Sequence, residues 1–206
     1  MQEIGENLVY IVDDCEKVRD GLSRLLESAG YRVVGFDSAE AFLAASTENY
    51  TCLILDVKMP GASGPELQEL LNRMGRTMHI VFLSGHADVH TSVEAMKRGA
   101  VDFLEKPVSS QTLLDAVALA TSKMRAQQEA LSKTENTRNK FNGLTPREKQ
   151  VMTMVVSGYP NKRIAAELGL HEQTVKQHRG SVMRKMNADS LADLVRMSAD
   201  FGQSPS

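Results

Sequence analysis

Acidic, hydroxyl and basic residues stand at the ends of four short apolar runs that lie far apart in the chain. These residues are Asp13, Asp14, Asp56, Ser84 and Lys106. The carboxyl ends of parallel strands meet at one edge of an open α/β sheet, where such sheets bind ligands. If the four runs are parallel strands, we expect the five side chains to surround one pocket.

This set of side chains suits the transfer of a phosphoryl group to a carboxylate. Three carboxylates repel one another unless a cation joins them, and Mg²⁺ accepts carboxylate, water and phosphate oxygens. Lys106 would add a second positive charge, and Ser84 would donate a hydrogen bond to the phosphoryl group. Asp56 is the candidate nucleophile, because the third run lies mid-sheet in the strand order 2-1-3-4-5.

The first 124 residues alternate apolar runs with amphipathic segments. The runs are typical of strands buried on both faces, and they are Leu8–Val12, Tyr31–Phe36, Cys52–Leu55, Ile80–Leu83 and Phe103–Leu104. Between them, apolar residues recur at helical spacing, as at Val18, Leu22 and Leu26. Residues 1–124 are therefore predicted to form an α/β domain with a flavodoxin-like, five-stranded parallel sheet.

The remaining residues predict a linker and a smaller all-α domain. In the linker, residues 125–142, we expect the preceding helix to continue to about Leu131 and Thr134–Asn142 to form a flexible tether. Residues 143–206 predict four helices. The first starts at a Thr145–Glu148 capping box and ends near Ser157, and the others span about Lys162–Leu168, Glu172–Met186 and Ser190–Ala199.

Composition and charge narrow the class of protein. The chain is 42% hydrophobic and 24% charged, which is typical of a globular protein. It has neither a membrane-spanning apolar run nor a signal peptide, so we expect a cytoplasmic protein without a membrane partner. Cys15 and Cys52 lack the spacing of a disulfide framework or a zinc site. Residues 1–124 carry a net charge of −7 and residues 125–206 one of +5, so the second part is the candidate for binding nucleic acid.

Residues 5–124 resemble the receiver domain of bacterial two-component response regulators. The resemblance rests on four motifs: IVDD at Ile11–Asp14, LDVKMPG at Leu55–Gly61, FLSGH at Phe82–His86 and DFLEKP at Asp102–Pro107. It implies that a sensor histidine kinase phosphorylates Asp56 in the presence of Mg²⁺. Asp14 would ligate the metal directly and Asp13 largely through water, with the carbonyl of Lys58 as a third protein ligand.

The same resemblance implies a conformational switch. On phosphorylation the Ser84 hydroxyl would move toward the phosphoryl group, and Phe103 would turn into the vacated space. The Lys106–Pro107 bond would be cis. Cys15 departs from the acidic or amide residue often found beside the aspartate pair, which bears on the lifetime of the phosphoryl group.

Leu144–Ala199 is similar to the LuxR/GerE-type helix-turn-helix domain of NarL/FixJ-type regulators. The matching motifs are LTPREKQVM, NKRIAAELGL, TVKQHRGSVMRKM and SLADLVRM. In the third predicted helix Val175, Val182 and Met186 form a buried stripe. The candidate DNA contacts lie elsewhere on it and are Thr174, Lys176, Gln177, His178, Arg179, Arg184 and Lys185. Two residues depart from the family pattern. Gly180 is a glycine in the interior of the third helix, and His171 is a weaker cap for that helix.

The sequence therefore predicts a transcriptional response regulator and not an enzyme. Phosphorylation would make the face near Val89–Arg98 and Phe103 self-complementary, and the resulting homodimer would bind double-stranded promoter DNA. RNA polymerase is a further candidate partner, and relief of contacts between the two domains is an alternative switch. Two other functions stay open: a phosphatase or phosphotransferase using the same carboxylates, and a protein that dimerises or relays without reading DNA.

Overall fold

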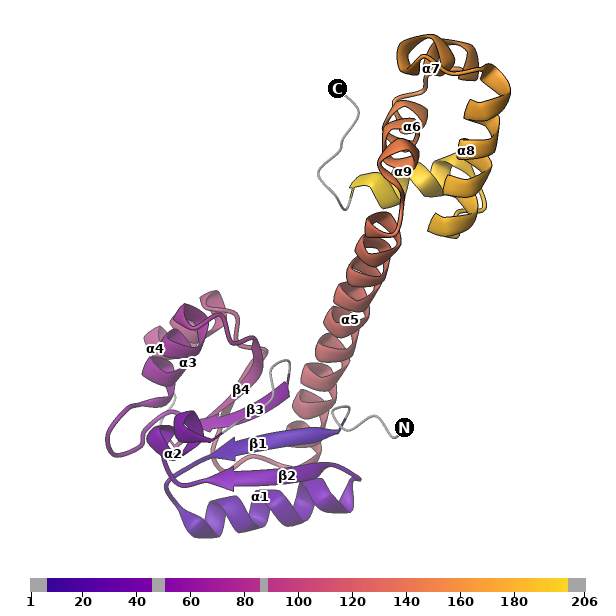
Figure 1. The fold of residues 1–206 in the computed structure, drawn as a ribbon. Coiled ribbons are helices and arrows are strands. Elements are labelled where there is room, and N and C mark those ends of the chain that lie inside the picture. The colour runs from indigo at the N-terminus through magenta and orange to yellow at the C-terminus, as the bar shows by residue number, and fades with distance from the viewer. Residues whose placement is uncertain (1–6, 46–50, 86–88, 200–206) are drawn as a thin grey trace. The chain divides into compact units, whose positions relative to one another are not determined.

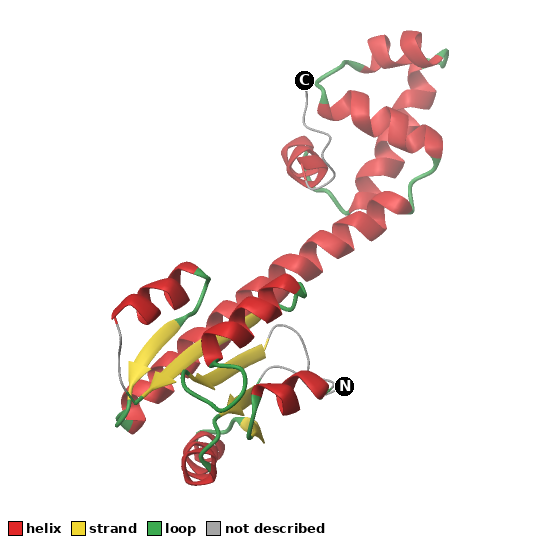
Figure 2. Cartoon of the chain, turned by 90° about the vertical axis from the view of Figure 1, so that its left-hand side faces the viewer, coloured by secondary structure: helices red, strands yellow, loops and turns green. Residues whose placement is uncertain are grey.

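The chain forms two compact units, Met1–Gln128 and Glu129–Ser206. The computed structural model describes residues 7–45, 51–85 and 89–199. Within those ranges the first unit combines a sheet with helices and the second contains helices and loops (Figures 1 and 2). No helix of the described ranges has the length and apolar character needed to cross a membrane.

A five-stranded parallel sheet forms the centre of the first unit. Its strands are β1 (Leu8–Val12), β2 (Arg32–Phe36), β3 (Thr51–Asp56), β4 (Met78–Ser84) and β5 (Asp102–Glu105). They lie in the order β2-β1-β3-β4-β5, which confirms the predicted sheet and strand order. Asp56 pairs with Leu83, and Ser84 with Glu105, so the ends of β3, β4 and β5 lie side by side.

Helices cover both faces of this sheet. One core packs β1, β3 and β4 against α2 (Ala39–Ala44), α3 (Gly64–Arg73) and α4 (Val89–Lys97). The other packs the opposite face against α1 (Glu16–Ser28) and α5 (Ser110–Asn142). Because both faces are covered, every residue of β1 and β3 is buried, as their continuous apolar runs predict. β2, at the edge, is partly exposed.

Helix α5 continues further than the sequence predicts. The expected flexible tether over Thr134–Asn142 is wrong, because the helix is unbroken as far as Asn142. The segment contains neither glycine nor proline, and the Thr134 and Thr137 hydroxyls donate to the carbonyls of Ala130 and Lys133, one turn earlier. The helix ends at Asn142, directly before Gly143. The boundary between the two compact units falls inside this helix.

The second unit contains α6 (Pro146–Val156), α7 (Asn161–Leu168), α8 (Glu172–Met186) and α9 (Leu191–Ala199). The predicted capping box is present: Thr145 Oγ1 accepts from the amide of Glu148, whose carboxylate accepts from the amide of Thr145. Gly169, at φ +62°, ends α7, and Val175, Val182 and Met186 of α8 lie in the core as predicted.

Candidate functional site

Lys106 joins two buried carboxylates at the carboxyl edge of the sheet. Its Nζ lies 2.6 Å from Oδ2 of Asp13 and 2.5 Å from Oδ1 of Asp56. Asp13 is 2% and Asp56 7% exposed, so both carboxylates are nearly removed from water. The sheet thus brings together three predicted residues from the ends of β1, β3 and β5.

Backbone groups hold the second oxygen of each carboxylate. The amide of Cys15 donates to Oδ1 of Asp13 at 2.9 Å, and the amide of Lys58 donates to Oδ2 of Asp56 at 2.8 Å. The amide of Lys106, directly after β5, donates to the carbonyl of Ser84, which places the lysine beside the last residue of β4. These bonds orient the three side chains before any reactant arrives.

The cluster has a shortage of positive charge. Burial raises the pKa of Asp56 above its ordinary value, and the Asp13 charge adds to this effect, while Lys106 and the Lys58 amide oppose it. Burial acts to lower the pKa of Lys106, but its hydrogen bonds and charge interactions with both aspartates raise it on balance. Lys106 is therefore charged at neutral pH and pairs with both carboxylates.

The predicted metal ligands are only partly gathered. Among the residues that the structure describes, no three His, Cys, Asp or Glu side chains are placed to hold a metal ion together. The structure places Asp13 and Asp56 around Lys106, with Asp14 exposed, and the meeting of the three aspartates around a cation stays a prediction. Buried carboxylates require a positive partner, and the lysine reaches both. Hard oxygen ligands with excess negative charge nevertheless fit Mg²⁺.

The two predicted switch residues lie on neighbouring strands. Ser84 is 1% exposed at the end of β4. Phe103, in β5, is half-buried, and its ring centroid lies 5.9 Å from that of Phe82. The Lys106–Pro107 bond is cis, as the resemblance implies.

Gly64 is a site residue that the sequence analysis missed. It starts α3, and its amide donates to the carbonyl of Val57 at 3.1 Å. A Cβ at this position would lie 2.3 Å from the carbonyl oxygen of Asp56 and 3.1 Å from the Phe82 ring. Only glycine therefore allows α3 to begin this close to the end of β3. The available signal was the Ser63–Glu66 capping box, which locates the start of the helix.

Replacing Gly64 with alanine is expected to destabilise the first unit by roughly 1–3 kcal/mol, because the backbone of Asp56 must shift. Gly21→Ala is the matched control. Gly21 lies inside α1 with nothing within 4 Å of an added Cβ, and this change should stabilise by about 0.5–1 kcal/mol. Denaturant unfolding followed by circular dichroism measures both variants. Equal effects of the two changes would contradict the close approach at Asp56.

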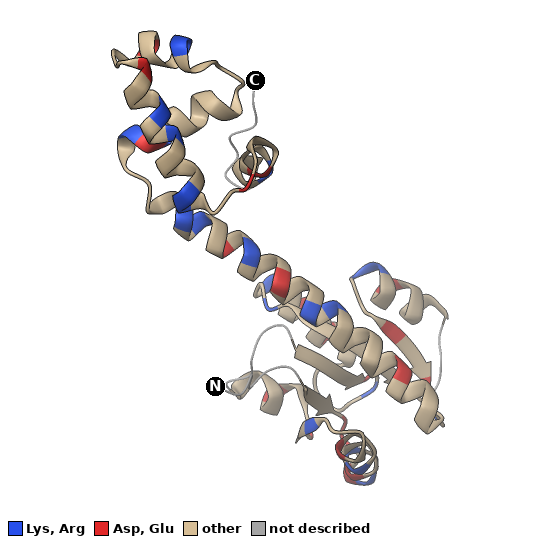
Figure 3. Ribbon diagram, turned by 90° about the vertical axis from the view of Figure 1, so that its right-hand side faces the viewer, with Lys and Arg blue, Asp and Glu red and all other residues tan. Residues whose placement is uncertain are grey.

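Helix α8 carries the candidate DNA contacts. Lys176, Gln177 and Arg184 are exposed, and Thr174, His178 and Arg179 are partly exposed. The helix contains Lys176, Arg179, Arg184 and Lys185, and Figure 3 colours Lys and Arg blue. Arg179 Nη1 donates to Oδ1 of Asn161, the first residue of α7, at 3.2 Å. This bond connects the arginine to the neighbouring helix.

Lys185 has an internal partner that the sequence analysis did not include. Its Nζ lies 2.7 Å from Oε2 of Glu148, the capping residue of α6. The Lys185 hydrogen bond and the Thr145 amide lower the pKa of Glu148 below its ordinary value of 4.5. The same carboxylate thus caps α6 and ties it to α8.

The Glu148 interaction predicts how the stability of the second unit depends on pH. Because the folded-state pKa is below the unfolded value, the contribution is complete above about pH 4.5 and is lost as the pH falls through the folded pKa. Glu148→Gln is expected to cost about 1 kcal/mol near neutral pH and to weaken this acid dependence. Amide hydrogen exchange of α6 in the full chain measures it. The contrasting control is Glu167→Gln, which changes an exposed acid of α7; a matching loss there would contradict the proposed interaction.

The fold and the two sites define a class of protein, and comparison with known proteins agrees. Residues 9–118 match the response regulator receiver domain, and residues 142–198 match the bacterial regulatory proteins of the luxR family. The chain belongs to the two-component response regulators of the NarL/FixJ type, which are transcription regulators.

Individual relatives cover nearly the whole chain. Nodulation protein W of Bradyrhizobium diazoefficiens is 48% identical over 95% of this chain and 86% of its own length. The transcriptional regulatory protein FixJ of Azorhizobium caulinodans is 41% identical over 96% of this chain and 94% of its own. Among solved structures, the response regulator StyR matches with a TM-score of 0.84 and 44% identity, over 93% of this chain and 98% of that one. These relatives confirm the resemblance identified from the motifs.

Proposed function

We propose that a sensor histidine kinase phosphorylates Asp56, and that this modification controls dimerisation and binding to double-stranded promoter DNA. The observation that carries the proposal is the buried Asp13–Lys106–Asp56 cluster, with Lys106 2.5 Å from Asp56. A carboxylate with an adjacent fixed cation, at the edge where parallel strands end, suits a phosphoryl acceptor.

In the transfer, an Oδ atom of Asp56 attacks the phosphorus of the kinase phosphohistidine. A P–O bond forms, the P–N bond breaks, and the bonding electron pair leaves with the imidazole. Lys106 retains its proton and offsets the negative charge of the transferred group. Mg²⁺, held by Asp13, Asp14, Asp56 and the carbonyl of Lys58, would supply further charge neutralisation when bound.

The Asp56 modification would act on its surroundings through Ser84 and Phe103. The Ser84 hydroxyl donates to a phosphoryl oxygen, and Phe103 turns inward into the space that Ser84 leaves. Phe103 packs on Phe82 through a ring contact and has no hydroxyl to hold it at the surface.

An apolar stripe on α4 supports homodimerisation on phosphorylation. Val89, Val93 and Met96 recur at helical spacing and are 75%, 45% and 44% exposed. Such residues gain free energy when a second copy of the same face covers them. Two linked DNA-binding domains then bind two half-sites together, which raises the effective affinity.

Helix α8 would enter the major groove of DNA. Lys176, Gln177 and Arg179 contact base edges, and the other candidate contacts, Thr174, His178, Arg184 and Lys185, approach the backbone or neighbouring bases. RNA polymerase is a further candidate partner. The protein would work in the cytoplasm as a regulator without catalytic turnover.

The experiment that tests this function selects DNA fragments with the full chain before and after phosphorylation. We expect phosphorylation to increase recovery of one shared sequence pattern, and the affinity for it to fall steeply with salt. Identical recovery in both states would contradict the switch. Sustained release of phosphate from a phosphoester would favour the enzyme alternative, and phosphorylation-linked dimerisation without any sequence preference would favour a relay.

A further inference from the structure

A pocket of about 310 Å³ lies at the start of β4, at the opposite end of that strand from Ser84. Its walls come from the loop between α3 and β4, the first residues of β4, the end of α4, and α5 at Gln127. All of these residues belong to the first compact unit. The volume is at the lower end of the range typical of small-molecule sites.

The lining of this β4-start pocket is cationic. Arg76 and Arg98 supply its positive charges, and the His79 ring and the side-chain amides of Asn72 and Gln127 complete its polar lining. Within the described residues that line it, none is an aspartate or glutamate. Guanidinium groups bind carboxylates and phosphates through paired hydrogen bonds, so this lining favours a small anion.

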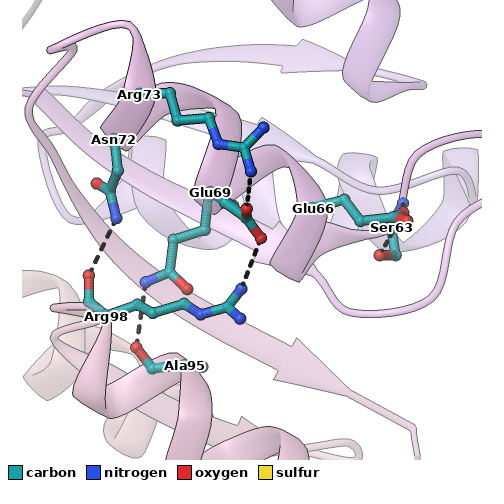
Figure 4. Close-up of polar contacts among 8 residues, drawn as sticks. Ser63, Glu66, Glu69, Asn72, Arg73, Ala95 and Arg98 are labelled. Carbon is teal, nitrogen blue, oxygen red and sulfur yellow. Dashed lines mark hydrogen bonds and ion pairs between the residues drawn. The ribbon is translucent and has the colours of Figure 1, made fainter.

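Several of these groups are already held in place. Arg98 Nη1 donates to Oε2 of Glu69 at 3.2 Å, and the carbonyl of Arg98 accepts from Nδ2 of Asn72 at 3.3 Å (Figure 4). The guanidinium carbon of Arg76 lies 5.8 Å from the centroid of the Phe42 ring. Side chains that are ordered beforehand lose less entropy when they bind a ligand.

The C-terminal ends of α3 and α4 lie beside the pocket. They repel an anion less than helix ends with unbonded carbonyls would. Their terminal carbonyls accept from nearby amides: Gly75 donates to Asn72, and Gly99 donates to Met96. The negative end of the helix dipole is thereby partly satisfied, and each arginine guanidinium carries five N–H donors.

His79 contributes a polar ring to the wall of the same pocket. Its Nε2 is buried and has no hydrogen-bond partner among the described residues. Burial and the Lys123 charge lower the pKa of His79, against a hydrogen bond with Gln127, so the ring is neutral near pH 7. A buried polar nitrogen without a partner is uncommon in folded proteins.

We propose that the β4-start pocket binds a small dianion carrying carboxylate or phosphate groups. Arg76 and Arg98 pair with its negative groups. The site is separate from Asp56, since it lies at the other edge of the sheet, and it does not depend on phosphorylation. It would give the receiver domain a second chemical input.

The test is a titration of the unphosphorylated full chain with succinate and, separately, glycerol 3-phosphate, followed by NMR. We expect at least one dianion to shift the amides of Gly75 and Gly99 in a saturable manner, with a Kd on the order of 1 mM. The probe that binds more tightly identifies the anion type. Succinamide, uncharged and similar in size, should cause no saturable shift.

Variants then locate the binding groups. Arg98→Gln is expected to raise the Kd roughly tenfold or more, and Arg76→Gln, which leaves the Arg98–Glu69 bond in place, should do the same. Arg73→Gln is the matched control, because Arg73 also pairs with Glu69 but does not line the pocket; its Kd should change by less than about twofold. The proposal would be overturned if neither dianion caused a saturable shift, or if the shifts were confined to the amide of Lys58 near Asp56. It would also be overturned if the Arg73 variant lost as much affinity as the two variants of the pocket arginines.

Discussion

Asp56→Asn is expected to abolish phosphorylation of the full chain and, with it, phosphorylation-linked dimerisation and the associated gain in DNA affinity. Asparagine has nearly the same shape but cannot form an acyl phosphate, because its amide nitrogen is not a competent nucleophile at this site. The fold should persist. The variant loses an ion pair with Lys106 but also removes a carboxylate whose ionised form is disfavoured by burial.

Intact-mass spectrometry after treatment with a histidine kinase measures the modification, and sedimentation of the same samples measures dimerisation. Asp115→Asn serves as the control, since Asp115 is an exposed aspartate of α5 hydrogen-bonded to Gln111. It should be phosphorylated and should dimerise like the parent. An Asp56→Asn protein that still dimerised and bound DNA on kinase treatment would show that the switch lies elsewhere.

Lys106→Met should have the largest effect on stability among the site variants. Methionine keeps much of the apolar stem but removes the ammonium that pairs with the buried carboxylates of Asp13 and Asp56. Removing one partner of a buried ion pair costs roughly 3–5 kcal/mol, and we expect about 2–4 kcal/mol here, since Lys106 itself is 24% exposed. Phosphorylation should also slow, because the fixed cation beside the acceptor is gone.

A double-mutant cycle tests this account. Denaturant unfolding measures the free energy of unfolding of the parent, Lys106→Met, Asp56→Asn and the double variant. The double variant should be more stable than Lys106→Met alone, since it removes one of the two repelling carboxylates. Mg²⁺ should stabilise Lys106→Met more than it stabilises the double variant, because the metal would bind the carboxylates that the lysine had neutralised. A Lys106→Met protein as stable as the parent would contradict the electrostatic account of the cluster.

The main predictions from sequence rest on local signals. Continuous apolar runs identify strands buried on both faces, and the capping box at Thr145 and Glu148 identifies the start of α6. Once the strands are parallel, their ends must share an edge, so Asp13, Asp56 and Lys106 could be placed together without coordinates. The motifs around these residues also identified the family.

Other features depend on contacts that no local pattern encodes. Thr134–Asn142 is helical where its sequence predicts a tether, because polar composition does not distinguish a solvated helix from a tether. The clash that requires glycine at position 64 arises only when α3 is packed against the end of β3. The partner of Lys185 is Glu148, 37 residues earlier in the chain. The positive charge of Lys185 predicted a DNA contact and not an ion pair within the protein.

The sequence by itself determined the two-domain organisation, the strand order and the acidic and basic residues available for chemistry, because hydrophobic periodicity and short motifs are properties of neighbouring residues. Only the tertiary structure decided which charges neutralise one another. It assigned Lys106 to both Asp13 and Asp56, and it gathered Arg76, Arg98 and His79 around a pocket at the opposite end of β4. Electrostatic energy depends on distance and burial, and both are set by how distant segments pack.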